Sequence, residues 1–416
     1  MKIALFNDTA AYGHFGCHAV SDAHARMLGR AGHEVKERFF LDWSPVVTDP
    51  RGPGAINHLL HDDDFRHRIE NVDAVIVNGE GTIHHGSGLH LLAVLGAAQK
   101  LGKATLLVNA VYENSEFHED VIARLDDFTV REQSSLEYAK SRKLPARLVL
   151  DSSYAASFSD DRLIDLSEKV VLTDWHLQRT ADVGKTIRDY LAERREHAFF
   201  LPFERSDAIK IWHRIPASLS SATVVHTARH HGVYFCIKAK IPFVALPSNT
   251  HKVEGLLKQY GPKIPIVKSL NDLKEGEKWA MANKNYYEDF FHKIEECLPL
   301  DTFRCLGEKF DPQGEQREIT KLALDLSHHS SSPMMNGEFE TKILSTKYID
   351  MVSSVKNSDT ADITSEDAFS QMRNELDALR SELGKLYDSR SWRLTAPYRF
   401  LGRFAHSLFG RMQSQP

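Results

Sequence analysis

The chain has 416 residues, of which 42% are hydrophobic and 26% are charged, and its formal net charge is -5. These values are near those of ordinary globular proteins, so they exclude a chain dominated by disorder. The acidic balance argues against a general nucleic-acid-binding protein, which needs a basic face. Because the length exceeds one ordinary hydrophobic core, we expect two domains and an additional segment.

The cysteines and the apolar runs indicate the compartment. The four cysteines, at positions 17, 236, 297 and 305, form no Cys-x-x-Cys pair, which favours neither a zinc site nor a disulfide framework and is typical of a reducing compartment. The first residues lead directly into a strand pattern with no export signal behind it. The apolar runs are also far shorter than a membrane span. We therefore expect a cytoplasmic protein.

Short apolar runs alternate with helical patterns from residue 1 to about 290, which is typical of parallel sheets covered by helices on both faces. Strands are expected at 2–6, 73–78, 104–109, 128–130 and 147–150, and then at 170–173, 198–201, 223–226 and 242–246. Helices are expected near 17–29, 89–101, 133–142, 181–194, 233–239 and 253–260. The pattern predicts an α/β fold with two doubly wound domains, at 1–156 and 168–305, and a ligand cleft between the carboxyl ends of their sheets.

The character of the sequence changes after about residue 310. Residues 306–365 contain polar stretches and are predicted to be a linker. From Phe369 to Leu386, apolar residues at spacings of three and four could pair with another helix as a short coiled coil, although they span fewer than three heptads. From Arg390 to Arg411, five arginines alternate with apolar side chains. This tail could lie on an anionic membrane surface or dock as an amphipathic helix on the protein itself.

The most informative junction lies after the strand expected at 223–226. Arg229, His230 and His231 stand there, where a buried strand becomes a helix, and Gly232 permits a tight turn. Unpaired backbone N–H groups at a helix start favour negative charge, and the fork of an arginine suits a carboxylate or a phosphate. This predicts a site for a small anion. The alternative is that Arg229 pairs with a surface acid and that the histidines cap the helix.

Two junctions of the first domain contain glycines at the ends of strands. Gly16, after the first strand, would let backbone N–H groups approach a ligand, but the spacing is not the dinucleotide fingerprint and a simple turn is the alternative. Gly79 and Gly81 bracket Glu80 after the next strand and would add polar groups to the same edge of the cleft. His84, a few residues later, could bind an anion or shuttle a proton, or could simply be solvated.

Two further cations lie beside these junctions. Arg131 begins a helix in the first domain, and Lys252 begins a helix beside the Arg229 junction. If Arg131 faces Arg229 across the cleft, the pair clamps a doubly charged anion. The alternatives are that Arg131 pairs with a neighbouring acid and that Lys252 is a solvated surface residue. No metal site is expected, because no carboxylate or cysteine stands at ligand spacing beside the histidines.

Taken together and in order, these junctions resemble the polysaccharide pyruvyl transferase family over roughly residues 1–290. The chain differs from the family pattern at His230, where an apolar residue is usual, and at Glu80, where a third glycine is common. The motifs that carry the resemblance are Asn7-Asp-Thr with His14-Phe-Gly-Cys17, Asn78-Gly-Glu-Gly-Thr-Ile-His84, Val130-Arg-Glu-Gln-Ser-Ser135, Asp151-Ser-Ser-Tyr154, Thr227-Ala-Arg-His-His-Gly232 and Pro247 through Lys252.

The resemblance implies two Rossmann-like domains in a GT-B-like fold. The heptad pattern adds a C-terminal helical or coiled-coil extension at 366–416. It also implies transfer of the pyruvyl group of phosphoenolpyruvate to two sugar hydroxyls, which gives a pyruvate ketal. Arg229 and His231 match the family's Arg-x-His donor motif, and Arg131 and Lys252 match its other basic positions. The residue types agree, because three cations can neutralise a carboxylate and a phosphate without a metal or cofactor, and histidine can transfer a proton near neutral pH.

Several roles and partners are expected on the same basis. His231 is the candidate acid/base, and Asp8 or Glu80 could accept the hydroxyl proton. The expected partners are phosphoenolpyruvate, a sugar or lipid-linked glycan acceptor, a second copy of the chain, and the inner face of the plasma membrane through 366–416. Two rival functions remain open. One is a GT-B-type glycosyltransferase that uses a nucleotide sugar, with Glu254 as the ribose-binding carboxylate, and the other is a non-enzymatic glycan-assembly scaffold.

Overall fold

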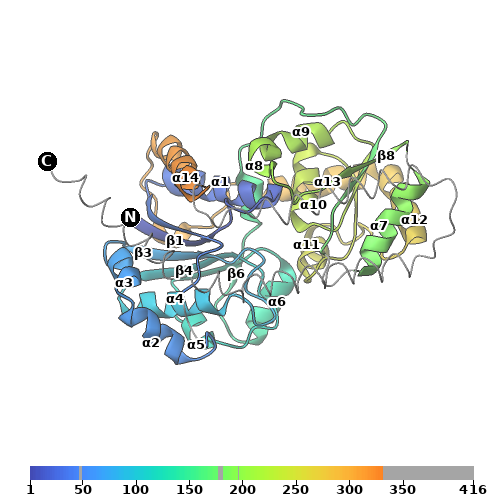
Figure 1. The fold of residues 1–416 in the computed structure, drawn as a ribbon. Coiled ribbons are helices and arrows are strands. Elements are labelled where there is room, and N and C mark those ends of the chain that lie inside the picture. Colours follow the sequence, from blue (N-terminus) through green and yellow to red (C-terminus); the bar gives the residue numbers. More distant parts are fainter. Residues whose placement is uncertain (46–48, 177–180, 195, 331–416) are drawn as a thin grey trace, which may run out of the picture. The chain divides into compact units, whose positions relative to one another are not determined.

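The computed structural model describes residues 1–45, 49–176, 181–194 and 196–330 (Figure 1). The chain divides into two compact units, Met1–Ser345 and Thr346–Pro416, and all described residues belong to the first. The coiled coil and the basic tail expected at 366–416 therefore lie outside the described residues.

The first sheet has six parallel strands in the order β2-β1-β3-β4-β5-β6. Its strand order reverses between β1 and β3, which are paired with Leu5 opposite Ile76. The sequence pattern did not predict one strand of this sheet, β2. Its charged residues interrupt the apolar run that would indicate a buried strand. The strands are β1 (Lys2–Asp8), β2 (Glu34–Phe40), β3 (Ala74–Asn78), β4 (Ala104–Ala110), β5 (Asp127–Val130) and β6 (Arg147–Leu148).

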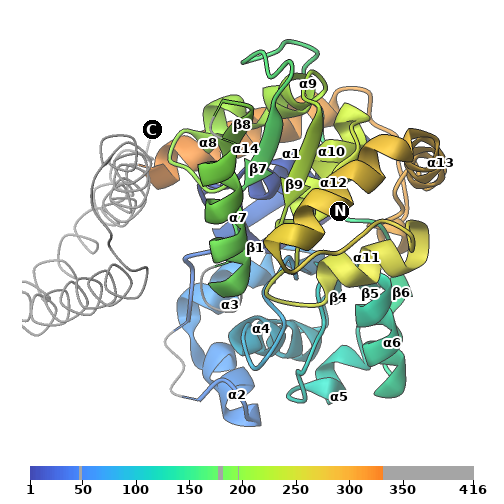
Figure 2. The ribbon, with the colours of Figure 1, turned by 90° about the vertical axis from the view of Figure 1, so that its right-hand side faces the viewer.

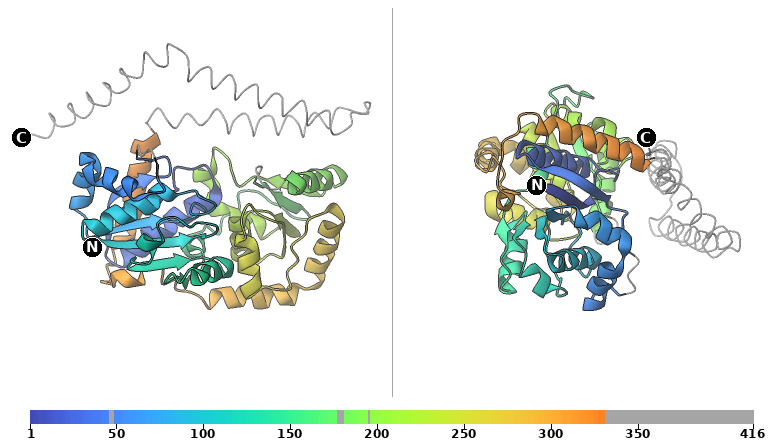
Figure 3. Two further views of the ribbon diagram at one scale, coloured as in Figure 1. Left: turned by 90° about the horizontal axis from the view of Figure 1, so that it is seen from below. Right: turned by 90° about the vertical axis from the view of Figure 1, so that its left-hand side faces the viewer.

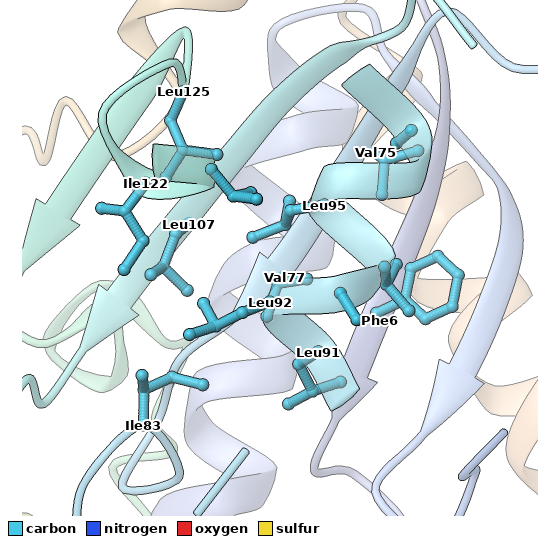
Figure 4. Packing of buried hydrophobic residues seen from close by; sticks show 14 of the residues in the cluster. Phe6, Val75, Val77, Ile83, Leu91, Leu92, Leu95, Leu107, Ile122 and Leu125 are labelled. Carbon is cyan, nitrogen blue, oxygen red and sulfur yellow. The ribbon is translucent and has the colours of Figure 1, made fainter. Parts of the chain in front are cut away.

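Both faces of the first sheet are buried, which explains why its strands read as continuous apolar runs. Successive side chains of a strand point to opposite faces, so Phe6 packs in one core and Leu5 in the other. Figure 4 shows Phe6, Val75 and Val77 packed against the apolar side of α4. The helices of this part are α1 (Phe15–Arg30), α2 (Pro53–His61), α3 (Asp63–Glu70), α4 (Leu89–Lys100), α5 (Glu119–Ile122) and α6 (Gln133–Ser141).

The second sheet has four parallel strands in the order β10-β9-β7-β8, so its order reverses between β7 and β9. Figure 2 shows α7, α11 and α12 beside these strands. The strands are β7 (Val170–Thr173), β8 (Ala198–Leu201), β9 (Val224–Thr227) and β10 (Phe243–Ala245). The helices are α7 (Ala181–Glu193), α8 (Ala208–Ile211), α9 (Ile215–Leu219), α10 (His230–Ala239), α11 (Lys252–Tyr260), α12 (Leu270–Ala282) and α13 (Lys284–Glu295). Three short 3-10 helices are η1 (Ser152–Ala155), η2 (Trp212–Arg214) and η3 (Arg304–Leu306).

Residues Gly314–Ser330, inside the stretch expected to be a linker, form the helix α14. It packs against α1, as the right-hand view of Figure 3 shows. Glu315 accepts hydrogen bonds from Arg26 and Arg30, and Leu322 packs in a small cluster that includes Ala25. The expectation of a linker over all of 306–365 was therefore wrong, because Ile319, Leu322 and Leu326 recur at helical spacing and pack together.

The α/β class with two successive Rossmann-like parallel sheets is confirmed, and the nine strands predicted from the sequence all occur with small shifts in their ends. The apolar runs are the reason, because strands buried on both faces carry a signal that does not depend on distant contacts. Within the described ranges, none of the helices is both long and apolar enough to cross a membrane.

Candidate functional site

Loops at the carboxyl ends of strands from both sheets surround a cavity of about 250 Å³. Its lining includes the loops after β1 and β3 and those after β7 and β9, the two places where strand order reverses. Such reversals are where open α/β sheets usually bind ligands. The lining residues are Thr9, Tyr12, His14, Cys17, Leu41, Glu80, Gly81, Thr82, Arg131, His176, Glu204, Arg229, His230, His231, Asn249 and Lys252.

Arg131 follows β5 and is almost completely buried. Its Nη1 forms an ion pair with Asp151, which lies after β6 at the start of η1. Burial alone would raise the pKa of Asp151, but Arg131 and then His231 outweigh it and hold that pKa well below its usual value. Asp151 is therefore a carboxylate, and Arg131 is a fixed cation at one side of the cavity.

His231 occupies the first turn of α10 and lies between charged groups of the first sheet. Its Nε2 is 3.4 Å from Arg131 Nη1 and from Asp151 Oδ2, and 3.5 Å from Glu80 Oε1. Two carboxylates and one guanidinium therefore surround this nitrogen. The ring lies so close to α1 that a Cβ at Gly16 would stand 2.0 Å from its Cγ. Gly16, expected to approach a ligand, instead makes room for the histidine.

Arg229 follows β9 and is paired with two carboxylates of the second sheet. Its Nη2 lies 2.5 Å from Asp174 Oδ2, after β7, and 3.2 Å from Glu204 Oε2, after β8. Its Nη1 lies 3.2 Å from the ring nitrogens of His176. The arginine does pair with acids, and one of them, Glu204, lines the cavity. A ligand anion would have to share or replace them.

Lys252, the first residue of α11, is buried and its Nζ donates to Asn249 Oδ1 at 2.7 Å. Within the part of the chain that the structure describes, it forms no ion pair. Burial and then the charges of Arg131 and Arg229 lower the pKa of Lys252 to about 7. A bound anion would stabilise the protonated, charged form of Lys252. Lys252 is therefore a favourable contact for the negative charge of a ligand.

The histidines around the cavity lie in a positive field. Burial and then neighbouring cations lower the pKa of His230 to about 3 and that of His176 to about 2. His14 has its pKa lowered well below the usual value by burial and by Arg229. These three rings are neutral at neutral pH and can accept or donate hydrogen bonds to a ligand.

Glu80 is the carboxylate of the first sheet that reaches the cavity. Its Oε2 accepts from Thr9 Oγ1 at 2.7 Å, and its Oε1 accepts from Cys17 Sγ at 3.3 Å. Burial and then Glu80 raise the pKa of Cys17 well above its usual value, so the thiol stays protonated and keeps donating. The flanking Gly81 has φ of +55°, in the left-handed region that favours glycine.

Besides Gly16, three residues expected at the site do not line the cavity. Asp8 is buried and bound by Arg38 and Ser21, so it serves the packing of β1 and α1 rather than the cavity. Gly79 packs so closely over Ala110 that a Cβ would stand 2.6 Å from it. His84 Nε2 lies 2.9 Å from the carbonyl oxygen of Gly81 and so holds the loop behind the cavity.

The structure adds residues to which the sequence assigned no role. His14, Cys17 and Asp151 belong to motifs already quoted, whereas Asp174 and Glu204 carry no local pattern beyond their position after a buried strand. That position could have indicated both residues, because Arg131 and Arg229 were predicted from their own positions after a buried strand. Within the described residues, no group of three or more His, Cys, Asp or Glu side chains is arranged to hold a metal ion.

Comparisons with known proteins address the family and the fold. A family model described as polysaccharide pyruvyl transferase matches residues 14–250, which is more than half of the chain. A search of curated protein sequences finds no match.

Solved structures similar to this chain include enzymes that act on nucleotide sugars. UDP-GlcNAc 2-epimerase from Methanocaldococcus jannaschii, in complex with UDP-GlcNAc and UDP, is 11% identical with a TM-score of 0.46, covering 71% of this chain and 100% of its own. The UDP-GlcNAc 2-epimerase from Neisseria meningitidis is 11% identical with a TM-score of 0.44 and coverage of 78% and 100%. MurG from Acinetobacter baumannii is 12% identical with a TM-score of 0.42 and coverage of 77% and 98%. These likenesses carry no conclusion about what this chain binds.

Proposed function

Since the chain belongs to the polysaccharide pyruvyl transferase family, we propose that it transfers the pyruvyl group of phosphoenolpyruvate to two hydroxyls of a sugar in a surface glycan or its precursor. The product is a pyruvate ketal. The observation that carries this proposal is that Arg131, Arg229 and Lys252 meet His231 at one cavity of about 250 Å³. Phosphoenolpyruvate is small and carries a carboxylate and a phosphate, which three cations can neutralise at once.

The three cations differ in how they would receive the donor. Lys252 forms no ion pair among the described residues and gains a counter-charge directly. Arg131 keeps its ion pair with Asp151. Its Nη2 lies near Gly81, where an added Cβ would stand 3.7 Å away. Arg229 would share its guanidinium between the donor and the partly exposed Glu204. Binding therefore leaves the buried pair of Arg131 and Asp151 intact, and Arg229 also keeps its ion pair with Asp174.

The reaction needs one proton delivered to carbon and one phosphate released. The first sugar oxygen bonds to C2 of the donor while C3 gains a proton and becomes a methyl group. The second sugar oxygen then bonds to C2 as the bond from C2 to the phosphate oxygen breaks. Of the two hydroxyl protons, one balances the proton gained at C3 and the other leaves with phosphate. The charge that develops on phosphate is stabilised by the cations already in place.

His231 is the proposed acid/base and Glu80 the proposed acceptor of a hydroxyl proton. His231 Nε2 lies 3.5 Å from Glu80 Oε1, so a proton taken by the carboxylate can pass to the imidazole without crossing solvent. Asp8, the other carboxylate considered from the sequence, is held by Arg38 away from the cavity and is left out of the proposal. The neutral Cys17 thiol keeps Glu80 oriented.

Calorimetric titration tests the donor. Phosphoenolpyruvate and a panel of nucleotide sugars are titrated into the wild-type protein and into Arg229→Ala. Arg147→Ala is the matched control, because Arg147 also pairs with two carboxylates, Asp127 and Asp301, and does not line the cavity. We expect phosphoenolpyruvate to bind the wild type and the control, and to bind Arg229→Ala much more weakly. Binding of nucleotide sugars alone would overturn the proposal.

The rival functions receive less support. Glu254, considered as a ribose-binding carboxylate, does not line the cavity. A glycan-assembly scaffold would not need a buried cationic cavity and should keep its cellular role in an Arg229→Ala, His231→Ala variant. We also propose that residues 366–416 bring the protein to the inner face of the membrane, and unchanged membrane fractionation after their deletion would contradict this.

A further inference from the structure

The cavity has two ends of different character. Arg131, Arg229 and Lys252 are 1%, 6% and 6% exposed, whereas Tyr12 and Leu41 are each 39% exposed. The cations therefore form a buried end, and an aromatic ring and an aliphatic side chain border the opening. Glu204, whose side chain is 37% exposed, lies at this opening too, because Tyr12 Oη donates to its Oε1 at 2.6 Å. The buried end suits a small anion, and the opening needs a different ligand.

Backbone hydrogen bonds hold the loops of Tyr12 and Glu204 together. Arg205 N donates to the carbonyl oxygen of Gly13 at 2.7 Å, and Phe15 N donates to that of Phe203 at 3.0 Å. The approach is so close that a Cβ at Gly13 would stand 2.8 Å from the carbonyl oxygen of Arg205. The loop after β1 and the loop after β8 are thus fixed to each other. The positions of Tyr12 and Glu204 do not depend on the contact between their own side chains.

Glu204 joins the opening to the donor end. Its Oε1 accepts from Tyr12, and its Oε2 lies 3.2 Å from Arg229 Nη2. A carboxylate offers about four lone-pair positions, so these contacts leave acceptor capacity for a hydroxyl at the opening. Burial and then Glu204 raise the pKa of Tyr12, which keeps its hydroxyl protonated and donating. The pair therefore presents a carboxylate acceptor next to an aromatic face.

We propose that Tyr12 and Glu204 form the subsite for the acceptor, and that the acceptor is a neutral hexopyranoside. The Tyr12 ring would lie against the apolar face of the sugar, and Glu204 would accept a hydrogen bond from a sugar hydroxyl beside those that attack the donor. The negative charge of Glu204 disfavours acidic sugars by repulsion between like charges. This inference rests on the proposed pyruvyl transfer and adds the class of its second substrate.

In this arrangement Glu204 positions a hydroxyl and makes or breaks no bond of its own. Arg229 contacts both Glu204 and, as proposed, the donor, so the sugar is held with its attacking hydroxyls next to C2 of the donor. Holding two reactants in attack geometry is itself a large part of catalysis. Removing the charge of Glu204 should weaken use of the acceptor and should not weaken binding of the donor, because Arg229 loses a competing anion.

The test uses the full chain, phosphoenolpyruvate and nitrophenyl glycosides of galactose, glucose, mannose, N-acetylglucosamine and glucuronic acid. Phosphate release gives kcat and KM for each glycoside, and calorimetry gives the donor Kd. The variants are Glu204→Gln and Tyr12→Leu, which removes the aromatic ring. Matched controls are Glu137→Gln, whose carboxylate pairs with Lys258 at 2.7 Å on the surface, and Tyr286→Leu, whose native hydroxyl accepts from Lys263 N.

We expect the KM for a neutral glycoside to rise about tenfold or more in Glu204→Gln, since hydrogen bonds to charged groups are worth more than neutral ones. In Tyr12→Leu the KM should rise several-fold, because the aromatic face for the sugar is lost. The donor Kd should stay the same or fall in Glu204→Gln, and the glucuronide should be discriminated against less. The two control variants should have the same KM for the glycosides and the same Kd for the donor as the wild type.

The possible failures are distinguishable. If phosphoenolpyruvate does not bind the wild type, the proposed function itself fails. If it binds but the KM for glycosides is unchanged in both variants, the acceptor subsite is overturned. Parallel loss of donor affinity, acceptor affinity and melting temperature would show a purely structural role and would also overturn it. So would a wild type that binds the donor but neither uses nor binds any neutral glycoside of the panel.

Discussion

Arg131 and Arg229 each follow a buried parallel strand and reach the same cavity, but their carboxylate partners lie at different depths. Arg131 pairs with Asp151, which is fully buried. Arg229 pairs with Asp174 and Glu204, whose side chains are 14% and 37% exposed. Water screens an exposed pair and competes for its partners, whereas a buried pair cannot separate without a large cost. One arginine is therefore a fixed part of the fold, and the other can exchange its partner for a ligand.

The largest effect should come from breaking the buried pair. Arg131→Met leaves Asp151 as an unpaired buried charge, and we expect a loss of ~3–5 kcal/mol in the free energy of unfolding. Urea denaturation measures it. Adding Asp151→Asn should recover much of the stability without recovering donor binding. An equal loss in Arg229→Met, whose partners are partly exposed, would contradict the distinction between the two arginines.

The exchangeable arginine should matter more for the ligand than for the fold. Arg229→Lys keeps the charge but loses the fork that binds an anion through two hydrogen bonds. We expect the Kd for phosphoenolpyruvate to rise about 10- to 100-fold, the range expected when one or two charge-assisted hydrogen bonds are lost. Calorimetry measures the Kd, and the melting temperature should change little. A large loss of stability with unchanged donor affinity would show that Arg229 serves the fold and not the ligand.

Lys252 should make donor binding depend on pH. Its pKa in the free protein is about 7, and a bound anion raises it, so binding takes up a proton above pH 7. Affinity should therefore fall as pH rises above 7, by at most about tenfold per pH unit. A phosphate monoester has its second pKa at about 6, so the ligand itself is already ionised in this range. Calorimetry in buffers of different ionisation enthalpy detects the proton uptake, which should vanish in Lys252→Met.

The smallest effect concerns His251, which lies just before Lys252 and faces carboxylates of the first sheet. Its Nε2 is 3.2 Å from Glu132 Oε1, and its Nδ1 is 3.5 Å from Glu113 Oε1. Burial alone would lower the pKa of His251, but Glu132 and then Glu113 raise it above its usual value. This stabilisation is fully present below the pKa of an unfolded histidine, about 6.5, and is lost as pH rises through the folded pKa.

We expect the loss to be under about 1 kcal/mol, because the imidazole is not fully buried. Urea denaturation between pH 6 and pH 9 should show this decline in the wild type and not in His251→Gln. An identical pH dependence in the two proteins would show that His251 does not carry a raised pKa.

The sequence by itself determined most of the strands and the positions of the cations along the chain. The runs that became β3, β4, β7 and β9 are buried on both faces, so each reads as a strand without knowledge of its neighbours. Because the carboxyl ends of parallel strands meet at one edge of a sheet, Arg131 and Arg229 could be expected to face a common cleft. The family followed from the order of these junctions along the chain.

Only the tertiary structure decided which charges meet. Asp174 and Glu204 reach Arg229 from two other strands of the sheet, and Asp151 reaches His231 from the other sheet. Asp8, a reasonable candidate by position, is held by Arg38 instead. Strand order and helix docking set these pairings, and no local pattern encodes them. The pKa of Lys252 depends in the same way on burial and on two distant arginines, so the chemistry of the cavity is a property of the assembled fold.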